Sequence, residues 1–253
     1  MLSALLFMGI FMLLFSRKSF RIRLKDLWCF LGSGIVSLLL FSLCYFSGMQ
    51  VTSLNVMAVL LYTSPAIIMI LSIILFHEKL TKRKLLALIM TFAGCCLVSG
   101  IGSESAVSMQ GLLLGLGAGF GYALYSIFGR CAIDRGYSSW TITFYTFLFC
   151  MLADAPLAEW GAMANAISAD RTLLFWMLGM GFVTAFLAFG FYTKGLEGME
   201  SSRAGILAST EPVVATLFGV FVFHERLTLP AIVGILLVLG GIVVLSGKKA
   251  AKA

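Results

Sequence analysis

Charged side chains are scarce in this sequence. Asp, Glu, Lys and Arg together make up 11% of the 253 residues, whereas hydrophobic residues make up 60%. A soluble domain carries roughly 25% charged residues, because water must solvate its surface. The shortage therefore excludes a soluble globular protein and predicts an integral membrane protein. The net charge of +7 does not indicate nucleic-acid binding, since the basic residues lie in short clusters between apolar runs.

Groups that carry chemistry are also few. The two histidines, His77 and His224, begin His-Glu pairs at the ends of apolar runs, lack the second histidine of a metalloprotease motif, and are predicted to anchor loops or cap helices. Gly111, Gly115 and Gly119 share a helix face but lack the Lys-Ser/Thr of a phosphate loop, which indicates helix packing. No Cys-x-x-Cys pair occurs, and six cysteines are interpreted as apolar fillers: Cys29, Cys44, Cys95, Cys96, Cys131 and Cys150. We therefore expect no enzyme activity, no ATP-driven transport, no cofactor and no metal site.

Long apolar runs dominate what is present. A transmembrane helix needs roughly 20 mostly apolar residues, and charges and turn residues divide the chain into nine such runs, of which the first is short. They span residues 2–16, 27–48, 54–76, 84–101, 109–131, 139–158, 173–192, 204–223 and 229–246. Every backbone group in the bilayer must pair within its own segment, so these runs are predicted to be helices. The fold class expected is an all-α integral membrane protein, a polytopic bundle of about nine transmembrane helices.

The basic residues predict an orientation. When the C-terminus is placed inside, all of the 18 Lys and Arg residues except Arg171 and Arg226 fall in loops or tails on the inner side. Cytoplasmic loops carry such an excess of positive charge. We therefore expect a multi-pass protein of the plasma (inner) membrane with a cytoplasmic C-terminus.

The sequence contains an internal repeat. Residues 76–81 (FHEKLT) recur as residues 223–228 (FHERLT), 147 positions later, and Pro65 matches Pro212 at the same offset. The repeat period spans five helices, and because five is odd the second copy must lie upside down relative to the first. Inverted repeats are typical of secondary transporters, whose halves exchange roles as access alternates between the two sides.

These motifs together resemble the EamA type of the drug/metabolite transporter superfamily. Each family repeat has a helix with a mid-membrane Pro and a terminal Glu-[Lys/Arg]-Leu, and here Pro65 leads to Glu78-Lys79-Leu80 and Pro212 to Glu225-Arg226-Leu227. The resemblance implies two inverted five-helix repeats, residues 1–101 and 109–247, the first lacking its opening helix. It also implies a carrier or exporter of small metabolites, such as amino acids or drugs. The second, third, seventh and eighth apolar runs, with the fifth contributing, would line the substrate path.

Polar residues inside the runs give the candidate substrate site. Glu211 lies about seven residues into the eighth run, where an ionisable group costs on the order of 2–3 kcal/mol unless it faces a cavity or a partner. The first copy has Ser64 at the matching position, so only one half carries the acid. We expect Glu211 to bind a cationic amine or to carry a proton; pairing with an Arg near the cytoplasmic face stays open. The other expected binding residues are Tyr62, Thr63, Ser64, Tyr122, Ser209 and Thr210, with Pro65 and Pro212 as helix kinks.

Two further tyrosines lie close to predicted loops. Tyr45 and Tyr192, matched in the repeat and close to loops, are interpreted as interface anchors.

Two other functions are possible from the sequence. An intramembrane enzyme would need clustered acids, bases or nucleophiles in the bilayer, and Glu211 is the one carboxylate well inside a run. A non-transporting assembly protein is the other alternative. The partners expected are a small-molecule substrate and the lipid bilayer, without nucleic acid, and a homodimer is left open.

Overall fold

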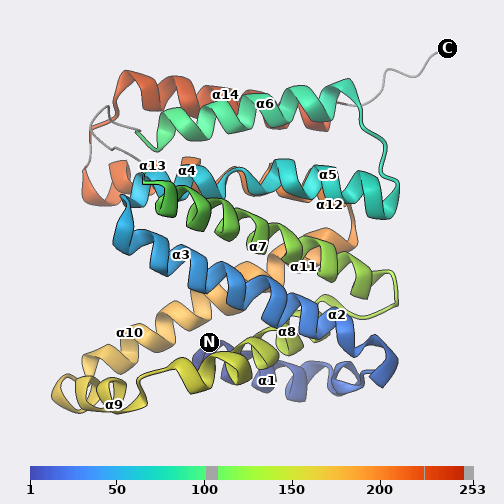
Figure 1. The fold of residues 1–253 in the computed structure, drawn as a ribbon, viewed down its shortest axis with the longest axis vertical. Helices are drawn as coiled ribbons and strands as arrows, with labels where there is room; N and C mark the ends of the chain where they lie inside the picture. The colour runs from blue at the N-terminus through green and yellow to red at the C-terminus, as the bar shows by residue number, and fades with distance from the viewer. Residues whose placement is uncertain (101–107, 225, 248–253) are drawn as a thin grey trace. The chain divides into compact units, whose positions relative to one another are not determined.

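The computed structural model describes residues 1–100, 108–224 and 226–247. The described chain is helical throughout and contains no strand (Figure 1). It divides into two compact units: unit 1 comprises Met1–Leu40 and Leu124–Met199, and unit 2 comprises Phe41–Ala123 and Glu200–Ala253. Glu225 of the second Glu-Arg-Leu motif and the basic C-terminal tail from Lys248 lie outside the described residues.

The helices of unit 1 come from the first forty residues of the chain and from residues 139–197. They are α1 (Leu2–Phe15), η1 (Arg17–Phe20), η2 (Leu24–Asp26), α2 (Leu27–Leu31), η3 (Gly32–Leu39), α8 (Ser139–Asp154), η4 (Ala155–Leu157), α9 (Trp160–Ala169), α10 (Thr172–Met180), η5 (Gly181–Leu187) and α11 (Ala188–Glu197). The segments η3 and η5 are π-helical and continue α2 and α10, respectively. A π-helical segment inside an α-helix often marks a functional position.

Unit 2 holds the remaining helices. They are α3 (Leu40–Val51), α4 (Leu54–Leu61), α5 (Ser64–Phe76), α6 (Lys82–Val98), α12 (Ser201–Ala208), α13 (Glu211–Phe223) and α14 (Leu229–Ser246). The helix α7 (Met109–Ile133) belongs to unit 2 up to Ala123 and to unit 1 from Leu124.

Seven helical spans in the described residues are long and apolar enough to cross a membrane. They are Leu24–Val51, Leu54–Phe76, Met109–Ile133, Ser139–Leu157, Thr172–Glu197, Ser201–Phe223 and Leu229–Ser246. The other two runs of the sequence prediction form shorter helices, α1 with 14 residues and α6 with 17. A short helix that the sequence did not predict, α9, follows α8. The chain is therefore a polytopic helical membrane protein.

Helix boundaries recur at the sequence offset. The helices α4 and α12 begin and end at residues 147 positions apart, and so do α5 and α13. Both α5 and α13 end at a histidine in the left-handed conformation, His77 with a φ of 53° and His224 with a φ of 55°. Few residues other than glycine adopt this conformation, and His is among those enriched in it. The two copies of the repeat thus share local backbone structure as well as sequence.

Within unit 2, α6 and α14 lie side by side along their lengths (Figure 1). A Cβ placed on Gly94 of α6 would come within 2.6 Å of the carbonyl oxygen of Gly234 in α14. Gly241, further along α14, faces Ala87, which comes earlier on α6. Because residue numbers rise on one helix as they fall on the other, the two helices are antiparallel. Small residues allow this close backbone approach, as in many membrane helix pairs.

The glycine contact gives a first prediction. We expect Gly94→Ala to destabilise the protein by about 1–3 kcal/mol, because the added methyl group meets a backbone carbonyl that cannot move without shifting α14. Gly179→Ala in α10 is the matched control, since a Cβ there meets nothing within 4 Å and alanine favours the helix. Thermal unfolding in detergent measures both. Equal melting temperatures for the two variants would show that the α6–α14 contact is not tight.

Candidate functional site

A narrow cavity in unit 2 lies where two broken helices meet α7. Its volume is about 10 Å³, close to the room that one water molecule needs. One side comes from the junction of α4 and α5, and the other from the junction of α12 and α13, which is the equivalent point of the second repeat copy. The lining residues that carry polar groups or shape the break are Tyr62, Ser64, Pro65, Tyr122, Ser209 and Glu211.

Each break is a two-residue turn directly before a proline-containing first helical turn. In the first copy, α4 stops at Leu61 and α5 begins at Ser64, and the Thr63 hydroxyl donates to the carbonyl oxygen of Leu60 at 2.6 Å. Pro65 has no N–H, so it fits the start of a helix, where that donor would have no partner within the helix. The interruption therefore places polar groups in the middle of a membrane-length span.

The second copy repeats this local chemistry. The Thr210 hydroxyl donates to the carbonyl oxygen of Leu207 at 2.8 Å, and Pro212 lies in the first turn of α13. Behind the turn, the thiol of Cys95 contacts the carbonyl oxygen of Ser209 at 3.6 Å. Hydroxyls and a thiol thus satisfy backbone carbonyls that the break has removed from the regular helical pattern.

The structure brings together most of the residues that the sequence predicted for binding. Tyr62, Ser64, Tyr122, Ser209 and Glu211 line the cavity. The two threonines of the turns and Pro212 are not among its lining residues; the threonine hydroxyls are engaged with the backbone as described above. Ser64 and Ser209 are both buried, with 4% of their surface exposed.

Glu211 differs from its neighbours in its exposure. It begins α13, and its side chain is exposed, whereas the following Pro212 and Val213 are buried. Among the described residues, none forms a hydrogen bond or an ion pair with its carboxylate. The N-terminal end of a helix carries partial positive charge, which favours a carboxylate in this position. The N-terminus of α13 therefore stabilises the Glu211 carboxylate, but no cationic side chain of the described residues in unit 2 pairs with it.

Aromatic rings from α3 and α7 lie near this carboxylate. Phe41 stacks on Tyr45 with ring centroids 5.4 Å apart and meets Tyr122 edge-on at 5.8 Å. Tyr122 of this set lines the same cavity as Glu211. Phe41 is not among the residues predicted for binding, and Tyr45 is interpreted from the sequence as an interface anchor. Their spacing of four residues, which places both on one helix face, is the signal in the sequence for a shared role.

Similarity to other proteins identifies the family. The model of the EamA-like transporter family matches residues 1–100 and 109–247. The chain belongs to the EamA-like transporter family. The resemblance seen in the sequence motifs is thereby confirmed, and the protein is a multi-pass membrane transporter.

Individual relatives of this EamA-like transporter are also described as transporters. An uncharacterized transporter of Archaeoglobus fulgidus is 30% identical over 200 residues, which cover 79% of this chain and 70% of the relative. YetK of Bacillus subtilis, also an uncharacterized transporter, is 29% identical over 231 residues, covering 89% and 69% of the two chains. A protein of known crystal structure superposes with a TM-score of 0.73 at 19% identity, over 97% of this chain and 86% of its own.

The EamA-like transporter also contains a buried ionic network in unit 2, away from the cavity residues. Glu78, in the loop after α5, accepts a hydrogen bond from the backbone N–H of Ser201 at 2.8 Å and so caps α12. Lys84, whose side chain is 3% exposed, pairs with Glu78 at 3.3 Å and with Glu200 at 2.9 Å. In the second repeat copy, the position of Lys84 is occupied by Ala231. The lysine at the centre of this cluster therefore has no equivalent in the second copy.

No metal centre is suggested by the described residues, which contain no group of three or more His, Cys, Asp or Glu side chains suited to hold an ion. The chemistry that the candidate site offers is one carboxylate, the hydroxyls of serine and tyrosine, and aromatic rings. These groups can bind and release a solute.

Proposed function

We propose that this protein is a secondary carrier of small metabolites that carry a cationic amine, with amino acids and amine drugs as the nearest examples. The observation that carries the proposal is the exposed, unpartnered carboxylate of Glu211 inside a membrane-length span. An ionisable group at that depth is costly unless it faces water, a partner or a substrate. A cation supplied by the substrate, or a proton between substrates, would fill this role.

The surrounding groups fit the same kind of ligand. Phe41, Tyr45 and Tyr122 form a connected set of rings beside the acid, and aromatic faces attract organic cations by roughly 0.5–2 kcal/mol each. The hydroxyls of Ser64 and Ser209 line the cavity, and a hydroxyl can accept a hydrogen bond from a polar ligand or donate one to it. An ammonium group with an attached polar or apolar body would use all three kinds of contact.

We further propose that the two repeat copies are inverted relative to each other and exchange roles during transport. Two observations support this arrangement. The boundaries of α4 and α5 recur in α12 and α13 at one constant offset, and the equivalent helices α6 and α14 pack antiparallel. Because α6 lies along the membrane-length α14, we count it as a span, and α1 is the ninth. A Ser–Glu difference between the copies gives the carrier a charge on one side of the cavity only.

The proposed orientation places the C-terminus in the cytoplasm, and this is a second prediction. A reporter that is active only outside the cytoplasmic membrane should stay silent when fused after the last residue. The same reporter inserted in the acidic loop near Glu159, which falls on the outer side, should be active. The reverse pattern would contradict the charge asymmetry on which the orientation depends.

The class of substrate can be identified by screening compounds for binding to the purified protein. A ligand that binds only the folded protein raises its melting temperature, by an amount corresponding to about 2.7 kcal/mol at 100 times its Kd. We expect a screen of amines, amino acids and neutral metabolites to give stabilising hits among the cationic compounds. These hits should no longer stabilise Glu211→Gln. Hits confined to anions or neutral sugars, equally strong in both proteins, would overturn the proposed substrate class.

A further inference from the structure

A second pocket, in unit 1, is lined by arginines. It has a volume of about 390 Å³ and lies between the loop that follows α1 and the loop that joins α7 to α8. Arg21 and Arg23 come from the first loop, and Arg135 comes from the second. None of the lining residues is acidic. The pocket thus concentrates positive charge at one end of the unit.

Of the three arginines, only Arg135 is neutralised within the described chain. It pairs with the buried Asp26 at 3.3 Å, and its guanidinium lies over the ring of Trp28 at 4.8 Å. No carboxylate of the described residues pairs with Arg21 or Arg23, and both residues are exposed. Two guanidinium groups therefore remain available to an anion.

The rest of the lining is polar, and its hydroxyls are hydrogen-bonded within the protein. The hydroxyls of Ser19, Ser138 and Thr141 are linked to one another, with Ser138 and Thr141 2.9 Å apart. The hydroxyl of Tyr137 donates to Asp26 at 2.8 Å, and burial raises the pKa of this phenol, so it stays neutral at physiological pH. The unpaired guanidinium groups of Arg21 and Arg23 therefore supply the donors, and arginine is the side chain best suited to bind phosphate through parallel N–H···O bonds.

The flanks of the pocket favour a lipid as the source of that phosphate. Phe15, just before the first loop, is 75% exposed, and Leu24, directly after Arg23, is 86% exposed. Large apolar side chains so exposed beside arginines match the boundary between acyl chains and headgroups. We propose that this pocket binds the phosphate of an anionic phospholipid headgroup, independently of the transport site.

The test compares three probes on the purified full-length protein in detergent. We expect phosphatidylglycerol to raise the melting temperature in a saturable way, whereas phosphatidylcholine has little effect. A basic residue near an anionic surface contributes about fivefold in affinity. The double variant Arg21→Gln/Arg23→Gln should therefore bind phosphatidylglycerol roughly 30-fold more weakly. Saturation by inorganic phosphate alone, with no further effect of the lipid, would overturn the assignment to a lipid.

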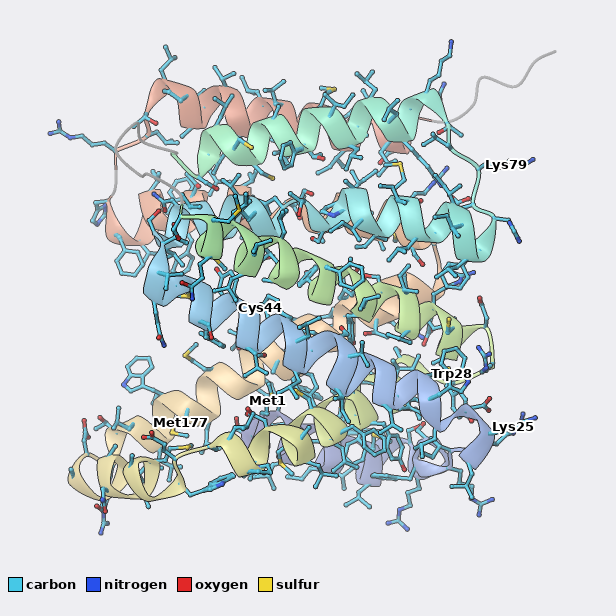
Figure 2. All side chains as sticks on the ribbon, in the orientation of Figure 1. Met1, Lys25, Trp28, Cys44, Lys79 and Met177 are labelled. Carbon is cyan, nitrogen blue, oxygen red and sulfur yellow. The ribbon has the colours of Figure 1, made fainter. Side chains whose placement is uncertain are left out.

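A charge-matched control separates the pocket from general basicity. Lys79, in the loop before α6, and Lys82, the first residue of α6, are exposed, and Figure 2 shows Lys79 extending away from the ribbon. The double variant Lys79→Gln/Lys82→Gln removes the same charge and should bind phosphatidylglycerol like the wild type. Equal weakening in both double variants would mean that net charge, not the pocket, attracts the lipid. Circular dichroism and the melting temperature without lipid establish that each variant is folded.

Discussion

Glu211→Gln is expected to lower the transport rate at least about 30-fold while the protein still folds and inserts. The substitution keeps the shape of the side chain and removes its charge. Loss of one partner from a desolvated charged pair typically costs 2–5 kcal/mol, which corresponds to a factor of roughly 30 or more. Uptake of a stabilising solute into proteoliposomes measures the effect. Any dependence of the wild-type rate on pH that arises from Glu211 should disappear as well.

The matched control is Glu159→Gln, the same change in an exposed loop residue that lies outside the candidate cavity. It should transport at the wild-type rate. Glu211→Asp retains the charge on a shorter side chain, and we expect measurable transport from it. Wild-type rates across a pH series from the Gln variant would rule out the role assigned to this carboxylate.

Glu78→Ala is expected to lower the stability of the protein by about 3 kcal/mol, or roughly 6–12 °C in Tm. The change leaves Lys84 buried with a single, half-exposed partner and removes the acceptor from the N-terminus of α12. Breaking a buried pair by removing one partner is costly because the other charge stays desolvated. Thermal unfolding in detergent gives the shift, and light scattering reports whether the folded variant remains monodisperse.

An exposed ion pair provides the contrast. Lys194 and Glu197 lie one helical turn apart in α11, with side chains 62% and 26% exposed. Such pairs contribute about 0–1 kcal/mol, since water already solvates both charges. Lys194→Ala should therefore change Tm by only a few degrees. A Glu78→Ala variant as stable as Lys194→Ala would show that the buried network does not hold α12 in place.

The helices themselves could be predicted from the sequence because hydropathy dominates in a membrane. Their interruptions could be predicted only in part. The prolines at 65 and 212 indicated irregular helices, but the breaks fall two to three residues earlier, at Tyr62-Thr63 and Ser209-Thr210. A proline cannot donate its N–H, yet it fits the first turn of a new helix, so the chain ends one helix before it instead of bending through it.

The residues of the candidate site could also be predicted only in part. Glu211, Ser64 and Tyr62 could be found because polar side chains within apolar runs are rare. The ring of Phe41 could not be found in this way, since phenylalanine is common in every run and only the packing of α3 beside α7 gives it a role. The bond from Glu78 to Ser201 joins residues 123 positions apart. Nothing in the local sequence of either residue indicates the other.

Solute counterflow in proteoliposomes tests most directly the claim that this protein is a carrier with its binding site at Glu211. Vesicles are loaded with an unlabelled amine identified by the stabilisation screen, and entry of a trace of the labelled compound is followed. A carrier that alternates access should accumulate the label transiently in wild-type vesicles, whereas Glu211→Gln vesicles should match protein-free ones. Entry in wild-type vesicles no faster than in protein-free vesicles, or equal accumulation by wild type and Glu211→Gln, would contradict the account.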